Sequence, residues 1–206
     1  MTSPKGRVGL LGGAFNPPHL GHLRLAALAL EHLALGALRF VPTAHSPRKP
    51  AQGEDGATRL RLLQAAVEGL GGPVSVESLE LDRGGISYTV DTLEALTARE
   101  PENAWIWLLG SDQLVQFDQW KNGARILELA SLAVALRPGC PKGVPETLAG
   151  RLRESWSGGP GELVWLPSTE LELSSSQLRQ GISQGWVPDG IPIQVQAAIE
   201  RENLYR

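Results

Sequence analysis

Short apolar runs along the chain alternate with longer segments in which apolar residues recur at helical spacing. The runs predict strands at Val8–Leu11, Leu38–Val41, Val74–Val76, Trp105–Leu109, Leu132–Leu136 and Leu163–Leu166. The longer segments predict helices at Leu20–Leu35, Ala57–Leu70, Thr89–Arg99, Ala124–Leu129, Pro145–Glu154, Ser175–Gln180 and Ile193–Arg201. Strands that alternate with helices indicate βαβ units, so we expect an α/β fold with a doubly wound, Rossmann-like parallel sheet.

The length of 206 residues suits one domain, and no boundary is visible along the chain. We therefore expect residues 1–206 to form a single domain, with a helical cap in the region from about 170 to 206. Sheets of this kind bind ligands at the carboxyl ends of their strands, near the point where the strand order reverses. The loops that directly follow strands are therefore the places to search for a site.

Composition narrows the class of protein. Hydrophobic residues make up 42% of the chain, which supports a sizeable core. The one cysteine, Cys140, excludes a disulfide within the chain and fits a reducing compartment. The opening residues are polar, and charged and histidine side chains interrupt the apolar stretch Leu20–Leu38. We expect a cytoplasmic protein with no membrane partner.

The distribution of charge is more informative than its sum. A net charge of −3 argues against general nucleic-acid binding. Residues 1–50 nevertheless hold six basic side chains and one acidic side chain. Such a bias suggests a local anion site, with chance as the alternative.

The first strand leads into the sequence GGAFNPPHLGH. Gly12 and Gly13 allow close approach of the backbone to a phosphate and permit a positive φ. Asn16 is a candidate cap for the next helix, whose start tolerates the two prolines that follow. The free amides of that helix start form an anion site.

His19 and His22 are three residues apart in the first turn of this helix, so they share one face. Imidazoles beside a bound anion donate hydrogen bonds to phosphoryl oxygens and stabilise developing charge. A metal site is the weaker reading, because the chain has four histidines and one cysteine and lacks an H-E-x-x-H pattern. A purely structural pair is the remaining alternative.

A second candidate phosphate element, Ser174–Arg179, lies near the C-terminus with the sequence SSSQLR. Serines before a helix are ordinary caps. Three hydroxyls, free amides and Arg179 also suit a triphosphate tail.

These two motifs resemble elements of a known enzyme superfamily. His19-Leu20-Gly21-His22 after the glycine pair resembles the H-x-G-H loop of the nucleotidyltransferase superfamily. Leu173–Arg179 resembles the I-S-S-T-x-[IV]-R element by which adenylyltransferases hold the β- and γ-phosphates, with Leu173 and Ser176 as conservative departures. From Val8 to Tyr205 the chain resembles the bacterial nicotinate-nucleotide adenylyltransferase family.

Further stretches support this closer resemblance. Ser87–Leu93 (SYTVDTL) is similar to the element S-Y-T-x-D-T-L, and Gly110–Asp112 is similar to G-x-D. Pro42–Lys49 resembles a loop that ends in P-H-K, with Arg48 in place of the histidine. Each stretch also has a purely structural alternative. Ser87 or Thr89 would cap a helix, Asp112 would be an N-cap, Lys49 would belong to a basic surface turn and Trp120 would be a packing residue. Trp105 and Trp107, inside a strand, are expected to pack in the core.

The resemblance implies adenylyl transfer from ATP to nicotinate mononucleotide, which yields deamido-NAD and pyrophosphate. The catalytic residues that it implies are His19, His22, Lys49 and Arg179. The ATP-binding residues that it implies are Gly12, Gly13, Ala14, Phe15, His19, His22, Gly110, Asp112, Ser174, Ser175 and Arg179. The residues implied for nicotinate mononucleotide are Asn16, Lys49, Tyr88, Thr89, Trp120 and Lys121. Mg²⁺ is expected on the phosphates of ATP, with no ligand from the protein.

Several alternatives stay open at this point. A related enzyme would act on nicotinamide mononucleotide or phosphopantetheine, or transfer a cytidylyl group. A nucleotide-sensing module would keep the fold without the chemistry. No K-M-S-K-S stretch is present, which argues against an aminoacyl-tRNA synthetase. Neither the preference between the two pyridine nucleotides nor the oligomeric state follows from the sequence.

Overall fold

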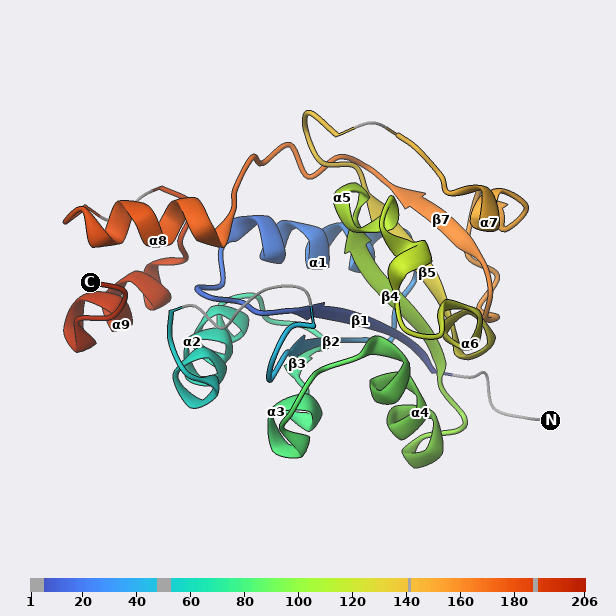
Figure 1. Cartoon of the computed structure of the whole chain (residues 1–206), viewed down its shortest axis with the longest axis horizontal. Coiled ribbons are helices and arrows are strands. Elements are labelled where there is room, and N and C mark those ends of the chain that lie inside the picture. The colour runs from blue at the N-terminus through green and yellow to red at the C-terminus, as the bar shows by residue number, and fades with distance from the viewer. Residues whose placement is uncertain (1–5, 48–52, 141, 187–188) are drawn as a thin grey trace.

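The computed structural model describes residues 6–47, 53–140, 142–186 and 189–206, and a seven-stranded parallel sheet forms its centre (Figure 1). The strand order is β3-β2-β1-β4-β5-β7-β6. The strands are β1 (Arg7–Gly13), β2 (Ala37–Pro42), β3 (Val74–Val76), β4 (Ala104–Gly110), β5 (Ala130–Ala135), β6 (Leu152–Arg153) and β7 (Leu163–Leu166). The order reverses between β1 and β4, which confirms the predicted doubly wound sheet.

Helices connect the strands and close the chain. They are α1 (Leu20–His32), α2 (Gly56–Glu68), α3 (Leu79–Arg83), α4 (Thr89–Arg99), α5 (Ser111–Leu114), the 3-10 helix η1 (Phe117–Gln119), α6 (Gly123–Leu129), α7 (Glu146–Ala149), α8 (Ser175–Ser183) and α9 (Ile193–Glu202). Within the described ranges, no helix has the length and apolar character that a membrane crossing needs.

One predicted helix is wrong over half its length. We expected a helix at Pro145–Glu154, but α7 ends at Ala149 and Leu152–Arg153 forms the edge strand β6 beside β7. Gly150, a poor helix former, follows the helix directly and favours its end. The five-residue helix α3 was not predicted, because it is too short to show a helical period.

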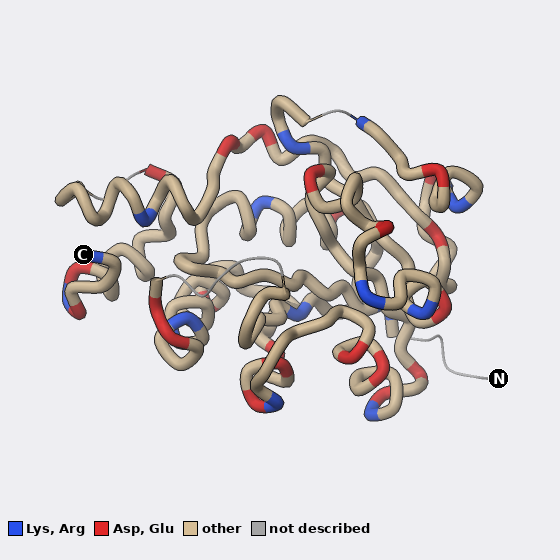
Figure 2. Tube along the Cα trace, viewed as in Figure 1, with Lys and Arg blue, Asp and Glu red and all other residues tan. Residues whose placement is uncertain are grey.

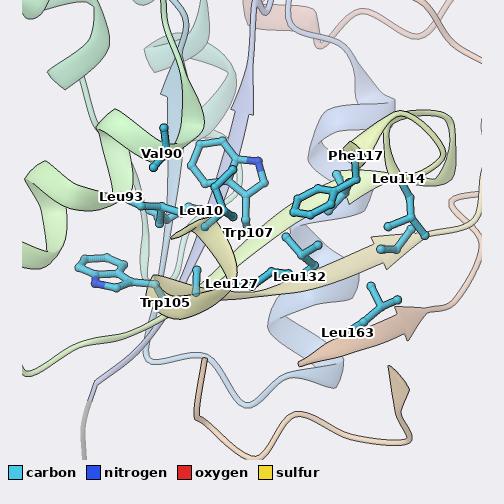
Figure 3. Packing of buried hydrophobic residues seen from close by; sticks show 14 of the residues in the cluster. Leu10, Val90, Leu93, Trp105, Trp107, Leu114, Phe117, Leu127, Leu132 and Leu163 are labelled. Carbon is cyan, nitrogen blue, oxygen red and sulfur yellow. The ribbon is translucent and has the colours of Figure 1, made fainter. Parts of the chain in front are cut away.

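Alternate residues of the central strands face two hydrophobic layers. On one face, Leu10, Trp105 and Trp107 pack with α4 and α6, as the close view in Figure 3 shows. On the other face, Ile106 and Leu108 belong to the cluster that contains α1 and α2. Both tryptophans are at most 4% exposed, so the prediction that they pack in the core is confirmed.

The two C-terminal helices form the predicted cap and pack beside α2 (Figure 1). Leu62 and Ala66 of α2 join Leu178 of α8 and Val195 of α9 in a third hydrophobic cluster. This packing brings the start of α8 next to the loop after β1, although the two segments are far apart in the sequence.

Candidate active site

The loop after β1 begins at two glycines that complete the strand. A Cβ atom at Gly12 would overlap the indole ring of Trp107, so this position has room only for glycine. The Gly13 carbonyl accepts a hydrogen bond of 2.9 Å from the main-chain N–H of Thr43. The strand extends through Gly13, so Gly12 and Gly13 both have negative φ angles, although glycine permits positive ones. The positive φ of this loop is at Phe15, at 47°.

The helix after this loop starts at Leu20, as predicted, but its cap is not the residue that we expected. His19 is the N-cap of α1, and the proposed cap Asn16 lies three residues earlier because two prolines intervene. Asn16 is 5% exposed, and its Oδ1 accepts a hydrogen bond of 3.3 Å from the N–H of Glu54. Asn16 therefore joins two loops instead of capping a helix.

The two histidines share one helix face, as predicted. Their rings stack with centroids 3.6 Å apart, and the main-chain N–H of His19 donates to Nδ1 of His22 over 3.2 Å. The ring of Phe15 is 1% exposed and contacts the His22 ring edge-on at 4.9 Å. Because Nδ1 of His22 is an acceptor, the proton of the neutral ring is on Nε2, which is then a hydrogen-bond donor.

Both imidazoles are neutral at pH 7 in the free protein. Burial, with the charge of Arg137 as a second cause, lowers the pKa of His19 to about 4. Burial also lowers the pKa of His22 well below its ordinary value, and His19 and Arg137 add to this effect. Nδ1 of His19 is buried without a hydrogen-bond partner among the described residues. Such an atom is one that a ligand would satisfy.

The C-terminal element contacts the first loop directly. The Ser174 hydroxyl caps α8 by accepting a hydrogen bond from the N–H of Gln177. The ordinary capping role considered for these serines is therefore confirmed for Ser174. The Ser175 hydroxyl donates to the carbonyl of Pro17 over 3.1 Å. Nη1 of Arg179 donates to the carbonyl of Asn16 over 2.8 Å. The two proposed phosphate motifs are therefore one surface.

Arg137 lies beside the candidate site residues His19 and Asp112, and we did not predict it. Its Nη1 lies 3.4 Å from Oδ2 of Asp112, and its Nη2 donates to the Leu173 carbonyl over 3.2 Å. Gly110 ends β4 and is the N-cap of α5, so Asp112 is a first-turn residue and not a cap. A signal was present in the sequence, since Arg137 directly follows the predicted strand Leu132–Leu136 at its carboxyl end.

Two of the proposed acceptor residues, Tyr88 and Lys121, are in contact. Tyr88 is the N-cap of α4 and Thr89 is its first residue, so neither Ser87 nor Thr89 caps this helix. Nζ of Lys121 lies 4.4 Å from the centroid of the Tyr88 ring. The same Nζ lies 3.0 Å from Oδ1 of Asp91 on α4.

Trp120 follows η1 and is only partly buried. Its ring lies against Phe117 with centroids 5.5 Å apart, in a tilted arrangement. One side of the indole therefore contacts the hydrophobic core, and its neighbour Lys121 joins it to the start of α4.

The basic bias of the first fifty residues does not form one anion site among the described residues. Arg39 is bound by Glu100 over 2.7 Å, and Arg7 donates to the carbonyl of Ser157 over 3.1 Å. Figure 2 shows the basic residues spread over the fold. The predicted residues Lys49 and Arg48 lie outside the described ranges. Among the described residues, the cations at the candidate site include Arg137 and Arg179, which come from later in the chain.

The described residues form no group of three or more histidine, cysteine, aspartate or glutamate side chains that could hold a metal ion. Asp112, the acidic residue that follows β4, is paired with Arg137. A divalent ion at this surface would depend on oxygen ligands from a bound nucleotide and from water.

The sheet, with a histidine pair at the carboxyl end of its first strand, defines a nucleotidyltransferase-type protein, and the sequence model of the cytidylyltransferase-like family matches residues 10–181. The fold is similar to that of the nicotinic acid mononucleotide adenylyltransferase of Plasmodium falciparum complexed with NaAD. The TM-score is 0.75 and the identity 16%, with 97% of each chain covered.

Relatives with higher sequence identity specify the family. The probable nicotinate-nucleotide adenylyltransferase of Bordetella petrii is 37% identical over 97% of this chain and 99% of its own. The corresponding protein of Bordetella avium is 39% identical over 97% and 98%. The chain therefore belongs to the nicotinate-nucleotide adenylyltransferase family, a family of enzymes that transfer an adenylyl group in NAD biosynthesis. The resemblance found in the sequence is confirmed.

Proposed function

We propose that this chain transfers the adenylyl group of ATP to nicotinate mononucleotide by direct, in-line attack. An oxygen of the 5′-phosphate of the acceptor forms a bond to the α-phosphorus of ATP. The bond between that phosphorus and the oxygen leading to the β-phosphate breaks, and pyrophosphate leaves. The observation that carries the proposal is the contact between the two phosphate motifs through the carbonyls of Asn16 and Pro17.

The histidine pair supplies neutral donors where charge develops. Nε2–H of His22 is fixed by the hydrogen bond that occupies Nδ1, and it donates to the α-phosphate as the leaving group departs. The unpartnered Nδ1 of His19 donates to a phosphoryl oxygen when it holds the proton. Neutral rings suit this task, because a donor that keeps its proton needs no transfer step. Holding two anions together is the main demand of this reaction.

The remaining ATP contacts surround this pair. Arg179, Ser175 and Lys49 hold the β- and γ-phosphates, together with the free amides at the start of α8 that Ser174 leads into. Gly110 and Asp112 face the ribose, and Arg137 adds positive charge beside the reacting phosphate. The main chain of Gly12, Gly13, Ala14 and Phe15 borders the nucleotide.

The acceptor occupies the surface formed by Tyr88, Thr89, Trp120 and Lys121, with Asn16 and Lys49 toward its phosphate. The exposed part of the Trp120 indole stacks on the pyridine ring. The close contact of Lys121 with Tyr88 supports a common site for these residues. An Mg²⁺ ion bound to ATP would neutralise part of the phosphate charge, with its ligands supplied by the nucleotide and water.

The proposed activity involves both ends of the chain. We infer that residues 1–206 act as one nucleotidyltransferase domain, with the second phosphate element in the region from about 170 to 206. ATP and nicotinate mononucleotide are its partners, with no nucleic acid or membrane required. A cytoplasmic location is supported by the single cysteine of the chain.

Pyrophosphate release tests this function. The protein is mixed with ATP and Mg²⁺ and with nicotinate mononucleotide, nicotinamide mononucleotide or phosphopantetheine. We expect strong preference for the first acceptor. Preference for nicotinamide mononucleotide would keep the mechanism and refute the acceptor. Turnover with phosphopantetheine alone would refute the roles of Tyr88 and Trp120, and no turnover with any acceptor would refute catalysis.

A further inference from the structure

Arg59 is a buried cation on α2 that has no role in the proposed mechanism. Arg59 is 6% exposed and lies on the same helix face as the buried residues Leu62, Leu63 and Ala66. A guanidinium group in such a place has lost its water and needs other hydrogen-bond acceptors in exchange. The identity of those acceptors shows what Arg59 does.

The acceptors are main-chain carbonyls from two different loops. Nη1 donates to Ala14 over 2.7 Å. Nη2 donates to Thr43 over 2.7 Å and to Ala44 over 3.3 Å. Ala14 belongs to the loop that leads from β1 to the histidine pair, whereas Thr43 and Ala44 follow β2. Because the guanidinium is planar and its donors have fixed directions, it sets the spacing of the two loops.

A second link extends from the loop after β2 to the acceptor side. The N–H of Ala44 donates to the Ser87 hydroxyl over 2.9 Å, and the N–H of Ser87 donates to the carbonyl of His45 over 2.9 Å. Ser87 immediately precedes Tyr88 and Thr89. A continuous series of hydrogen bonds therefore joins the ATP loop at Ala14, through Arg59 and Ala44, to the acceptor loop at Ser87.

We propose that Arg59 is a positioning residue that couples the ATP half of the site to the acceptor half, an inference that rests on the proposed function. One guanidinium bonds both loops, so a shift of either loop breaks a bond to a buried charge. Binding of one substrate thus stabilises the loop arrangement that the other substrate requires. Such coupling is reciprocal, because each ligand changes the affinity of the other by the same factor.

The test compares the wild-type protein with Arg59→Lys by titration calorimetry. The dissociation constant of α,β-methylene-ATP, which does not transfer its adenylyl group, is measured with and without saturating nicotinate mononucleotide. We expect the acceptor to tighten analogue binding roughly fivefold or more in the wild type. In Arg59→Lys the factor falls close to one, because an ammonium group lacks the planar fork that reaches both loops. The affinity for each substrate alone stays nearly unchanged, while kcat falls.

Arg61→Lys is the matched control. Arg61 is on the same helix but pairs with Glu202 at the surface, so the variant keeps the wild-type factor. Wild-type coupling in Arg59→Lys, or no coupling in the wild type, refutes the inference. If Arg59→Lys does not fold, the same titration is made with Ser87→Ala, which removes the acceptor of the Ala44 N–H. Lost coupling in this variant supports the inference, and retained coupling refutes it. Failure of the proposed function is seen separately, as a wild-type protein that releases no pyrophosphate.

Discussion

Acid should destabilise the free protein through His19, and the size of the effect follows from its burial. The residue is 2% exposed, and its pKa falls from 6.5 to about 4 on folding. Between these values the unfolded chain binds a proton that the folded protein does not bind. The contribution of the neutral His19 to stability is therefore complete above pH 6.5 and is lost as the pH falls toward 4.

Each unit of pKa shift corresponds to about 1.4 kcal/mol, so the shift of His19 amounts to about 3 kcal/mol over the whole window. About 2 kcal/mol of this is lost between pH 7 and pH 5. The variant His19→Asn has no imidazole to protonate and keeps a good N-cap side chain.

The assay is urea unfolding of both proteins at several pH values, in a buffer without phosphate. The stability of the wild type minus that of His19→Asn should decrease by about 2 kcal/mol from pH 7 to pH 5. Carboxylates that titrate in this range cancel in the difference. A difference that stays flat within about 0.5 kcal/mol would show that His19 takes up its proton as easily in the folded protein as in the unfolded chain.

Three further substitutions test the site. His22→Ala should reduce kcat on the order of a hundred- to a thousandfold with an unchanged circular dichroism spectrum, because it removes one charge-stabilising donor; near-full activity would exclude that role. Arg137→Met should raise the pKa of His19 in NMR titrations of the free protein, because one cause of its depression is removed, and an unmoved titration would contradict this. Gly12→Ala should cost about 1–3 kcal/mol in urea unfolding because the added methyl group overlaps Trp107, and a wild-type midpoint would contradict the packing.

The fold was predictable because the strands of a parallel sheet are buried on both faces. Trp105–Leu109 has no charged residue and is buried throughout, so its apolar run is plain in the sequence. The edge strand Leu152–Arg153 is exposed along its length and has two residues, so it leaves no such run. Burial explains both the success and the miss.

The site was predictable only where side chains form local motifs. His19 and His22 share a helix turn, so their common face follows from spacing alone, whereas the stacking of their rings was seen only in the structure. Arg59 and Arg137 instead bind carbonyls of distant segments, and carbonyls are the same in every residue type. A weak signal existed for Arg59, since it occupies the apolar face of α2 with Leu62 and Leu63. Its partners could not have been read from the sequence.

The contact between the two phosphate motifs also has a consequence for protein synthesis. Residues of the first loop leave the ribosome well before Ser175 and Arg179, which bind its carbonyls and follow more than 150 residues later. A nascent chain therefore holds the histidine pair without the second half of the phosphate surface until α8 has emerged. We expect ATP binding to begin only after α8 has emerged, so the metabolite would bind and stabilise nascent chains that include α8 but not shorter ones.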